Sequence, residues 1–340
     1  MAANETPTAL ILGATGGIGG AVASALIARG WRVRALTRDV ARARRDFSRL
    51  GPVEWVEGDA MQTGAVVAAA AGAQLILHGA HPPGYRNWRG LALPMLESSI
   101  AAARASGARL VLPGTIYNFA PEDGPLLDER TPQRPTTRKG RIRVEMEERM
   151  AQAAASGVRS LVVRAGDFFG AFAPSSWFAG AMVRPGKPVR FVIYPGRRDV
   201  GHAFAYLPDL AEAIARLAAI EARLAPFEVV HFAGHWLERG VLMAEAIRRV
   251  AGAPTAPILP FPSALLPLAA PFSTMLREMI ELRYLWRVPL RLDNRKLETL
   301  IGAEPHTALD EAVRRSLAGL GCLPMSCQLT ALSFQLSATK

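Results

Sequence analysis

A glycine-rich run near the start of the chain constrains the fold more than any other feature. The apolar segment Leu10–Leu12 reads as the end of a strand, and Gly13, Gly16 and Gly19 follow it at the spacing G-x-x-G-x-x-G. In such a run one glycine allows a tight turn, one lets the backbone approach a pyrophosphate, and one allows close packing of helix on strand. The N–H groups that open the next helix then face the phosphates. The run therefore predicts a dinucleotide-binding turn after the first strand of an α/β domain.

Strand and helix patterns alternate through the first half of the chain. Strands are predicted at residues 8–12, 32–36, 53–56, 74–78, 109–112 and 158–164, and helices at 17–29, 65–71, 91–105 and 138–155. Alternation of this kind is typical of a parallel sheet with helices on both faces and right-handed crossovers. The predicted fold class is α/β, a Rossmann-type doubly wound parallel sheet.

The second half of the chain is less regular and predicts a smaller lobe. We expect a nucleotide-binding domain at residues 1–165, mainly a substrate-binding lobe at 166–322 with elements returning to the sheet, and a poorly ordered tail at 323–340. Short strands are predicted at 191–194 and 228–231, and helices at 210–219, 241–250 and 309–320. Aromatic residues gather with glycine and proline between Phe168 and Phe178, which suits a substrate-facing loop rather than a sheet. With Tyr85 and Trp88 they predict an apolar or aromatic substrate pocket, ordinary core packing being the alternative.

Charge and hydropathy exclude several other classes of protein. The net charge of +11 comes from basic residues spread along the chain, without a zinc ligand set or an aromatic RNA-binding signature. It favours a site for an anionic cofactor over nucleic-acid binding. The apolar stretch 258–280 is broken by four prolines, so no membrane span is expected. The first residues lack a signal-peptide pattern and the two cysteines give no disulfide framework, so we expect a cytoplasmic protein.

Several motifs in a fixed order resemble those of the extended and atypical short-chain dehydrogenase/reductases, the NAD-dependent epimerase/dehydratase group. Besides the glycine run they are Gly58-Asp59, His78-Gly79-Ala80, residues 162–166, residues 204–211 and residues 292–309. The resemblance implies a nicotinamide dinucleotide with Asp59 near its adenine and residues 78–80 beside its nicotinamide ribose. The cofactor-binding residues it predicts are Gly13, Thr15, Gly16, Gly17, Ile18, Gly19, Arg38, Asp59, Ala60, His78, Gly79 and Ala80.

The end of the second strand decides between the two nicotinamide cofactors. NAD-binding proteins usually place there a carboxylate that bonds the ribose 2′-hydroxyl. Here Thr37 and Arg38 follow Leu36, and a guanidinium can grip a 2′-phosphate in a bidentate manner. We therefore expect NADP(H), with NAD as the alternative. The competing interpretation is that Arg38 is a solvent-exposed loop residue that pairs with Asp39 and binds no cofactor.

The same resemblance implies a Tyr-x-x-x-Lys pair at a helix start, and this chain departs from it. Counting back from Glu145 puts Thr137 in the tyrosine position and Arg141 in the lysine position. Threonine is too weak an acid to replace tyrosine, and arginine cannot relay a proton. Thr115, as a donor to a substrate carbonyl, and Tyr117 are the leading alternatives in the loop after the fifth strand. His81, Tyr85 and Lys139 are further candidates.

Two functions follow from these residues. The first is an NADP(H)-dependent oxidoreductase or epimerase of atypical type, acting on a small organic carbonyl, alcohol or enone. The second is a catalytically inactive NADP(H)-binding sensor, like the related nitrogen-regulator sensors, that contacts a protein partner. A homodimer is left open. His202, Asp209, His231 and His235 lack metal-ligand spacing, Asp209 is expected to cap a helix, and no metal is predicted.

Overall fold

A seven-stranded parallel sheet forms the centre of the molecule. The computed structural model describes residues 6–82, 87–173, 176–261 and 280–323. The strand order is β11-β7-β5-β4-β1-β2-β3, and all six pairings are parallel. The strands are β1 (Thr8–Leu12), β2 (Arg32–Thr37), β3 (Val53–Glu57), β4 (Leu75–His78), β5 (Arg109–Thr115), β7 (Ser160–Ala165) and β11 (Phe227–Phe232). The predicted doubly wound sheet is confirmed.

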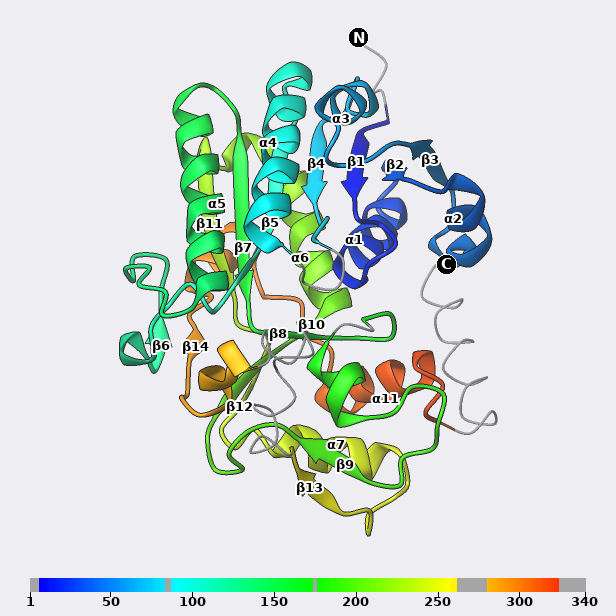
Figure 1. Ribbon diagram of the computed structural model, residues 1–340, viewed down its shortest axis with the longest axis vertical. Helices are drawn as coiled ribbons and strands as arrows, with labels where there is room; N and C mark the ends of the chain where they lie inside the picture. The colour runs from blue at the N-terminus through cyan, green and yellow to red at the C-terminus, as the bar shows by residue number, and fades with distance from the viewer. Residues whose placement is uncertain (1–5, 83–86, 174–175, 262–279, 324–340) are drawn as a thin grey trace.

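Helices cover both faces of this sheet and make a three-layer unit (Figure 1). One face carries α3 (Thr63–Ala69), α4 (Trp88–Ser106) and α5 (Arg138–Ala155), whose apolar side chains share one core with those of β1, β4 and β5. The other face carries α1 (Gly17–Ala28) and α6 (Leu207–Ala219), which pack against each other, and α2 (Val40–Asp46) lies beside β3. All five residues of β1 are buried, as expected for a central strand covered on both sides.

A second lobe lies beyond the carboxyl ends of the strands, in the lower half of Figure 1. Its three-stranded sheet has the order β12-β10-β8, and two further strand pairs, β13-β9 and β14-β6, lie beside it. Its elements are β6 (Leu126–Leu127), β8 (Asp167–Phe169), β9 (Val192–Tyr194), β10 (His202–Tyr206), β12 (His235–Leu237), α7 (Leu242–Val250), β13 (Ile258–Pro260), β14 (Arg291–Leu292) and α11 (Leu309–Gly319). The helix α10 (Arg295–Ile301) follows β14 but packs against β11 and α6 of the central unit. Buried aromatic rings fill its core.

One prediction for this lobe was wrong. Residues 167–169 form strand β8 rather than a loop, because they pair in parallel with β10. Phe169 and Phe178 are fully buried in the core of the lobe, whereas Phe172 is 46% exposed. Only Phe168 and Trp177 of this aromatic group line the cleft described below. Tyr85 and residues 324–340 lie outside the described residues.

Candidate functional site

The glycine turn lies between β1 and its neighbour β4, at the point where the order of the strands in the sheet reverses. After β3 the chain returns past β1 to form β4, so the strand order diverges at this point, where doubly wound sheets bind their ligands. Gly13 has φ +87°, and a Cβ at this residue would lie 2.5 Å from the carbonyl oxygen of Gly79. A Cβ on Gly19 would collide with the Gly13 carbonyl. The glycines therefore let the turn, the end of β4 and the start of α1 approach one another.

The start of α1 leaves backbone donors available. Its N-cap Gly16 makes no side-chain capping bond, and the first turn contains no acidic residue. Within the described part of the chain, no acceptor faces the N–H groups of Gly17 and Ile18. Unpaired N–H groups at a helix start, with the helix dipole behind them, bind phosphate well. This end of α1 therefore fits the pyrophosphate of a dinucleotide.

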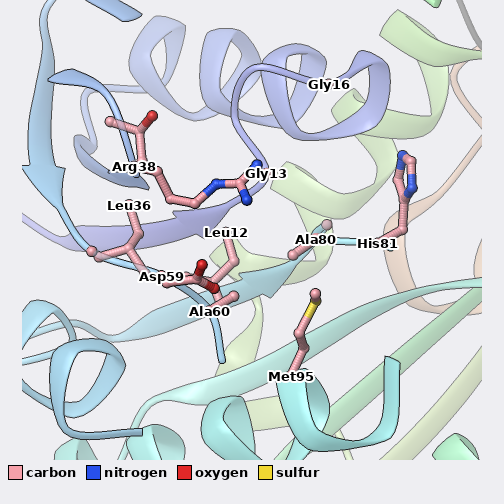
Figure 2. A pocket seen from close by; sticks show the side chains of 13 residues that line it. Leu12, Gly13, Gly16, Leu36, Arg38, Asp59, Ala60, Ala80, His81 and Met95 are labelled. Carbon is pink, nitrogen blue, oxygen red and sulfur yellow. The ribbon is translucent and has the colours of Figure 1, made fainter. Parts of the chain in front are cut away.

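A pocket beside this turn collects the residues predicted to hold the adenosine half of the cofactor (Figure 2). Its lining residues are Leu12, Gly13, Gly16, Leu36, Thr37, Arg38, Gly58, Asp59, Ala60, Gly79, Ala80, His81 and Met95. Figure 2 shows the Arg38 side chain extending from the end of β2 over the pocket towards Gly13.

The charged residues of this pocket differ in how they are held. Among the described residues no carboxylate pairs with Arg38, because Asp39 caps α2 by accepting a hydrogen bond from the Arg42 N–H at 2.9 Å. The Asp59 carboxylate accepts the Met61 N–H at 2.9 Å, which keeps the side chain in place at the end of β3. The Arg38 guanidinium is therefore available to an anionic group in the pocket.

A larger cleft of about 430 Å³ continues from the glycine turn towards the second lobe. From the nucleotide side its lining includes Thr15, Gly16, Gly17, Ile18, His78, Gly79, Ala80, Thr115 and Tyr117. From the chain after β7 and from the second lobe it includes Gly166, Asp167, Phe168, Ala173, Ser176, Trp177 and Leu282, and Leu207 at the start of α6 lines it as well. Of the predicted cofactor residues, Gly19 alone lines neither pocket, and it has the packing role described above.

His78 presents a hydrogen-bond acceptor at this cleft. The Ser99 hydroxyl donates to the Met95 carbonyl, so it accepts from His78 Nδ1 at 2.8 Å and Nε2 carries no proton. His78 Nε2 is buried without a hydrogen-bond partner among the described residues. Burial, together with the charge of Arg143, lowers the pKa of His78 to about 3. The ring therefore stays neutral, and Nε2 is an acceptor without a partner among the described residues beside the cleft.

Thr115 is oriented by a buried polar network. The amide nitrogen of Asn118 donates to Glu147 at 2.8 Å and to Gln133 at 2.7 Å, so its oxygen accepts the Thr115 hydroxyl at 2.9 Å. Glu147 is held in turn by the Arg164 guanidinium, and both side chains are 3% exposed. Thr115 was predicted to donate to a substrate carbonyl, but here its proton is directed to Asn118. Towards the cleft, the Thr115 hydroxyl oxygen can therefore act only as a hydrogen-bond acceptor.

The two residues at the start of α5 predicted for the catalytic pair, Thr137 and Arg141, do not line the cleft. Thr137 is the N-cap of α5 and accepts the Gly140 N–H, and Arg141 is exposed, so neither lines the cleft. Lys139 and Arg143, four residues apart on one helix face, line it instead. Both cations lie over the Trp88 ring, at 5.6 Å and 5.2 Å from its centroid.

The count from Glu145 explains this difference. Glu145 is partly exposed and pairs with Arg149, whereas the buried glutamate of α5 is Glu147. Counting back from Glu147 gives Lys139 and Arg143. No sequence signal separates the two glutamates, because both lie on a charged helix and only packing decides which one is buried.

The remaining candidates are dispersed. Asp209 lies inside α6, whose N-cap is Tyr206, so it does not cap the helix as expected; its carboxylate accepts the N–H and hydroxyl of Thr307, each at 2.7 Å. His231 is a buried histidine of β11, in the strand predicted at residues 228–231. No three metal-binding side chains come together in the described ranges. None of the helices described there is both long and apolar enough to cross a bilayer.

His202 pairs with a residue that sequence reasoning missed. Its Nε2 lies 2.8 Å from Asp167 Oδ2. Asp167 stands 35 positions earlier in the chain, and the pairing of β8 with β10 brings the two together.

Comparisons with known proteins agree with this geometry. Residues 5–81 match the model of the NmrA-like family. A comparison with curated protein sequences finds no match. A putative epimerase from Burkholderia cenocepacia has a similar structure, with a TM-score of 0.70 at 18% identity over 93% of this chain and 98% of the other.

Two further solved structures are equally similar. A nucleoside-diphosphate-sugar epimerase from Pseudomonas aeruginosa gives a TM-score of 0.69 at 16% identity, over 94% of this chain and all of the other. A UDP-glucose 4-epimerase from Bifidobacterium longum, in complex with NAD+ and UDP, gives 0.69 at 14% identity, over 91% and 97%. The chain therefore has a Rossmann-type fold like that of these epimerases, and its residues 5–81 match the NmrA-like family model.

Proposed function

We propose that this protein is an NADP(H)-dependent oxidoreductase that acts on a small organic carbonyl, alcohol or enone. The ends of β1 and β4 would hold the nicotinamide cofactor, and the N–H groups at the start of α1 would bind its pyrophosphate. When bound, the cofactor supplies or accepts a hydride. The protein holds the cofactor, orients the substrate beside it and manages the proton.

The observation that carries the cofactor choice is the placement of Arg38. The residue stands just beyond β2, lines the adenosine-side pocket and pairs with no carboxylate of the described chain. A guanidinium fits a phosphate through two parallel hydrogen bonds, whereas it adds little to a ribose hydroxyl. The 2′-phosphate of NADP(H) is the group this arginine suits.

Binding titrations with NADPH and NADH test this choice. A hydrogen bond to a charged group contributes about 1.5–3 kcal/mol, so Arg38→Leu should weaken NADPH binding roughly 10- to 150-fold and leave NADH nearly unchanged. Arg44→Leu is the matched control, because Arg44 is exposed on α2 and lines neither pocket. Equal losses for both cofactors would refute the phosphate role, and no binding of either would refute the function as a whole.

The cleft residues define the kind of substrate. Trp88, Ile116, Phe168, Trp177, Leu207 and Leu282 give it an apolar and partly aromatic lining. Lys139 and Arg143 add two positive charges beside Trp88, and Tyr117 and Thr115 add hydroxyl groups. A small substrate with an apolar or aromatic body and one reacting oxygen fits these groups. Turnover of NADP(H) with a panel of alcohols, carbonyls, quinones and enones tests this class.

A cofactor-binding sensor is the second candidate. The absence of tyrosine from the cleft-facing positions of α5, where Lys139 and Arg143 lie, favours it, because the usual proton donor is missing. A sensor would bind NADPH yet turn over nothing in the panel, while its affinity for a protein partner would change with the NADP+/NADPH ratio. Turnover of any panel compound at a rate that depends on cleft residues would exclude it.

A further inference from the structure

We propose that Asp167 and His202 form the acid–base pair of the cleft, with Asp167 accepting the proton of a substrate hydroxyl and His202 positioning it. This inference rests on the proposed oxidoreductase function. The substrate form that this site recognises is the alcohol.

Strand pairing fixes the two side chains relative to each other. Asp167 opens β8 and lies opposite Phe204 of β10, and His202 is two residues before Phe204. Because side chains two residues apart in a strand share a face, His202 points to the same side of the small sheet as Phe204. His202 Nε2 lies 2.8 Å from Asp167 Oδ2. Asp167 lines the cleft, and its partner His202 lies behind it in the second lobe.

The hydrogen-bond partners of His202 determine how many protons the pair holds. Nδ1 lies 3.0 Å from the carbonyl oxygen of Leu285, which can only accept, so Nδ1 carries a proton. Nε2 faces a carboxylate oxygen, and two lone pairs cannot stay 2.8 Å apart without a proton between them. One proton therefore lies between Nε2 and Oδ2, and we infer that it sits on Nε2, facing a carboxylate of Asp167. The pair is neutral overall, which suits its burial.

Packing holds the ring in this orientation. His202 is 6% exposed and stacks on Trp286, with ring centroids 3.9 Å apart and planes 16° apart. Phe204 packs on it as well, at 4.7 Å. The ring cannot rotate away from Asp167 without displacing an indole from the core of the lobe.

The other carboxylate oxygen of Asp167 is left for a ligand. The side chain is 21% exposed and lines the cleft, and Oδ1 accepts no hydrogen bond within the described part of the chain. Asp167 is also the single carboxylate among the described residues that line this cleft. Burial lowers the pKa of His78 to about 3, so this ring does not take up a proton near neutral pH. Burial also raises the pKa of Tyr194 and Tyr284, near Asp167, above the usual tyrosine value, so these phenols stay protonated.

The proposed reaction is the oxidation of an alcohol to a carbonyl compound. Asp167 Oδ1 would take the hydroxyl proton while the O–H electron pair forms the carbonyl π bond, and a bound oxidised nicotinamide would supply the acceptor for the hydride that leaves the carbon. The His202 proton stays on Nε2 and bonds Oδ2 throughout. Asp167 then gives its new proton to water. In the reverse direction a protonated Asp167 donates to the carbonyl oxygen.

A test that does not need the substrate is the protonation state of His202. NMR of isotope-labelled histidine near neutral pH should show both ring nitrogens protonated in the wild type. In Asp167→Asn the amide can donate to Nε2, so His202 should change to a neutral ring with only Nδ1 protonated. The chain has six histidines, so the one signal that this substitution moves can be assigned directly. A single protonated nitrogen in the wild type would overturn the proposal.

Turnover gives the second arm of the test. General acid–base groups contribute about 100- to 10 000-fold, so Asp167→Asn should lower the rate of alcohol oxidation by that factor while the Kd for NADP+ stays unchanged. Asp199→Asn is the control, since Asp199 is an exposed partner of Arg197 outside the cleft. A thermal melt excludes misfolding of either variant.

The outcomes separate this inference from the proposed function. Unchanged turnover in Asp167→Asn would refute the role of the pair alone. Failure to bind either cofactor, or bound cofactor without turnover of any panel compound, would refute the proposed function and this inference with it.

Discussion

The buried ion pair of Arg164 and Glu147 should be the most sensitive electrostatic element of the fold. Arg164 Nη2 lies 2.6 Å from Glu147 Oε2, and the Nε of Arg164 lies 3.2 Å from both carboxylate oxygens. Glu147 also accepts from Asn118 and Gln133. Replacing it with leucine leaves a buried guanidinium and two amide donors without their acceptor.

The size of the effect follows from what remains buried. Breaking one partner of a buried pair costs about 3–5 kcal/mol, because the remaining charge is not solvated. The domain as a whole is stable by about 5–15 kcal/mol, so Glu147→Leu should remove a large part of that margin. Denaturation in urea, monitored by circular dichroism and extrapolated to water, measures the loss.

A double variant distinguishes charge burial from lost packing. In Glu147→Leu/Arg164→Met no charge is left unpaired, so the free energy of unfolding should recover by at least about 1.5 kcal/mol relative to the single variant. Asp310→Asn breaks the exposed pair with Arg249 and should cost less than about 1 kcal/mol. A double variant less stable than Glu147→Leu would refute the argument from an uncompensated charge.

Three further outcomes are expected. Gly13→Ala should abolish NADPH binding and lower the melting temperature, because its Cβ would lie 2.5 Å from a backbone oxygen at φ +87°; wild-type binding would show that the turn tolerates a side chain. Arg143→Met should weaken the binding of both nicotinamide cofactors equally in the same titration, unlike Arg38→Leu, because Arg143 lines the cleft and places a positive charge beside it. Burial, together with the charge of Arg164, lowers the pKa of His231 to about 4. Between about pH 6.5 and 4, His231 therefore binds a proton in the unfolded chain but not in the native state. Over that window the free energy of unfolding should fall by roughly 3 kcal/mol as the pH is lowered, and His231→Gln should lose that part of the slope in denaturation curves at several pH values.

The positions predicted best from sequence are those set by local pattern. The strand at residues 8–12 and the helix that follows it are separated by glycines, and the structure has β1 at Thr8–Leu12 and α1 from Gly17. Arg38 follows β2 directly, so finding the strand end is enough to place it at the pocket. Thr115 ends β5 and lines the cleft for the same reason.

The prediction that residues 167–169 form a loop failed because their strand depends on a distant partner. β8 is three residues long and has no alternating pattern of its own, and it exists as a strand through its pairing with β10. The phase of α5 was also beyond sequence reasoning. Lys139 faces the cleft and Arg141 faces solvent because the helix buries Glu147 on Arg164, a contact with β7.

The sequence by itself therefore determined the parallel sheet, the glycine turn and the position of Arg38 after the second strand, beside the pocket at that turn. These depend on periodicity and on neighbours within a few residues, which the chain carries locally. Only the tertiary structure decided which side chains meet in the cleft: Lys139 with Arg143 beside Trp88, Thr115 bound to Asn118, and Asp167 bound to His202. The physical reason is that strand pairing and helix phase, set by burial across the whole fold, bring together residues that no spacing in the sequence connects.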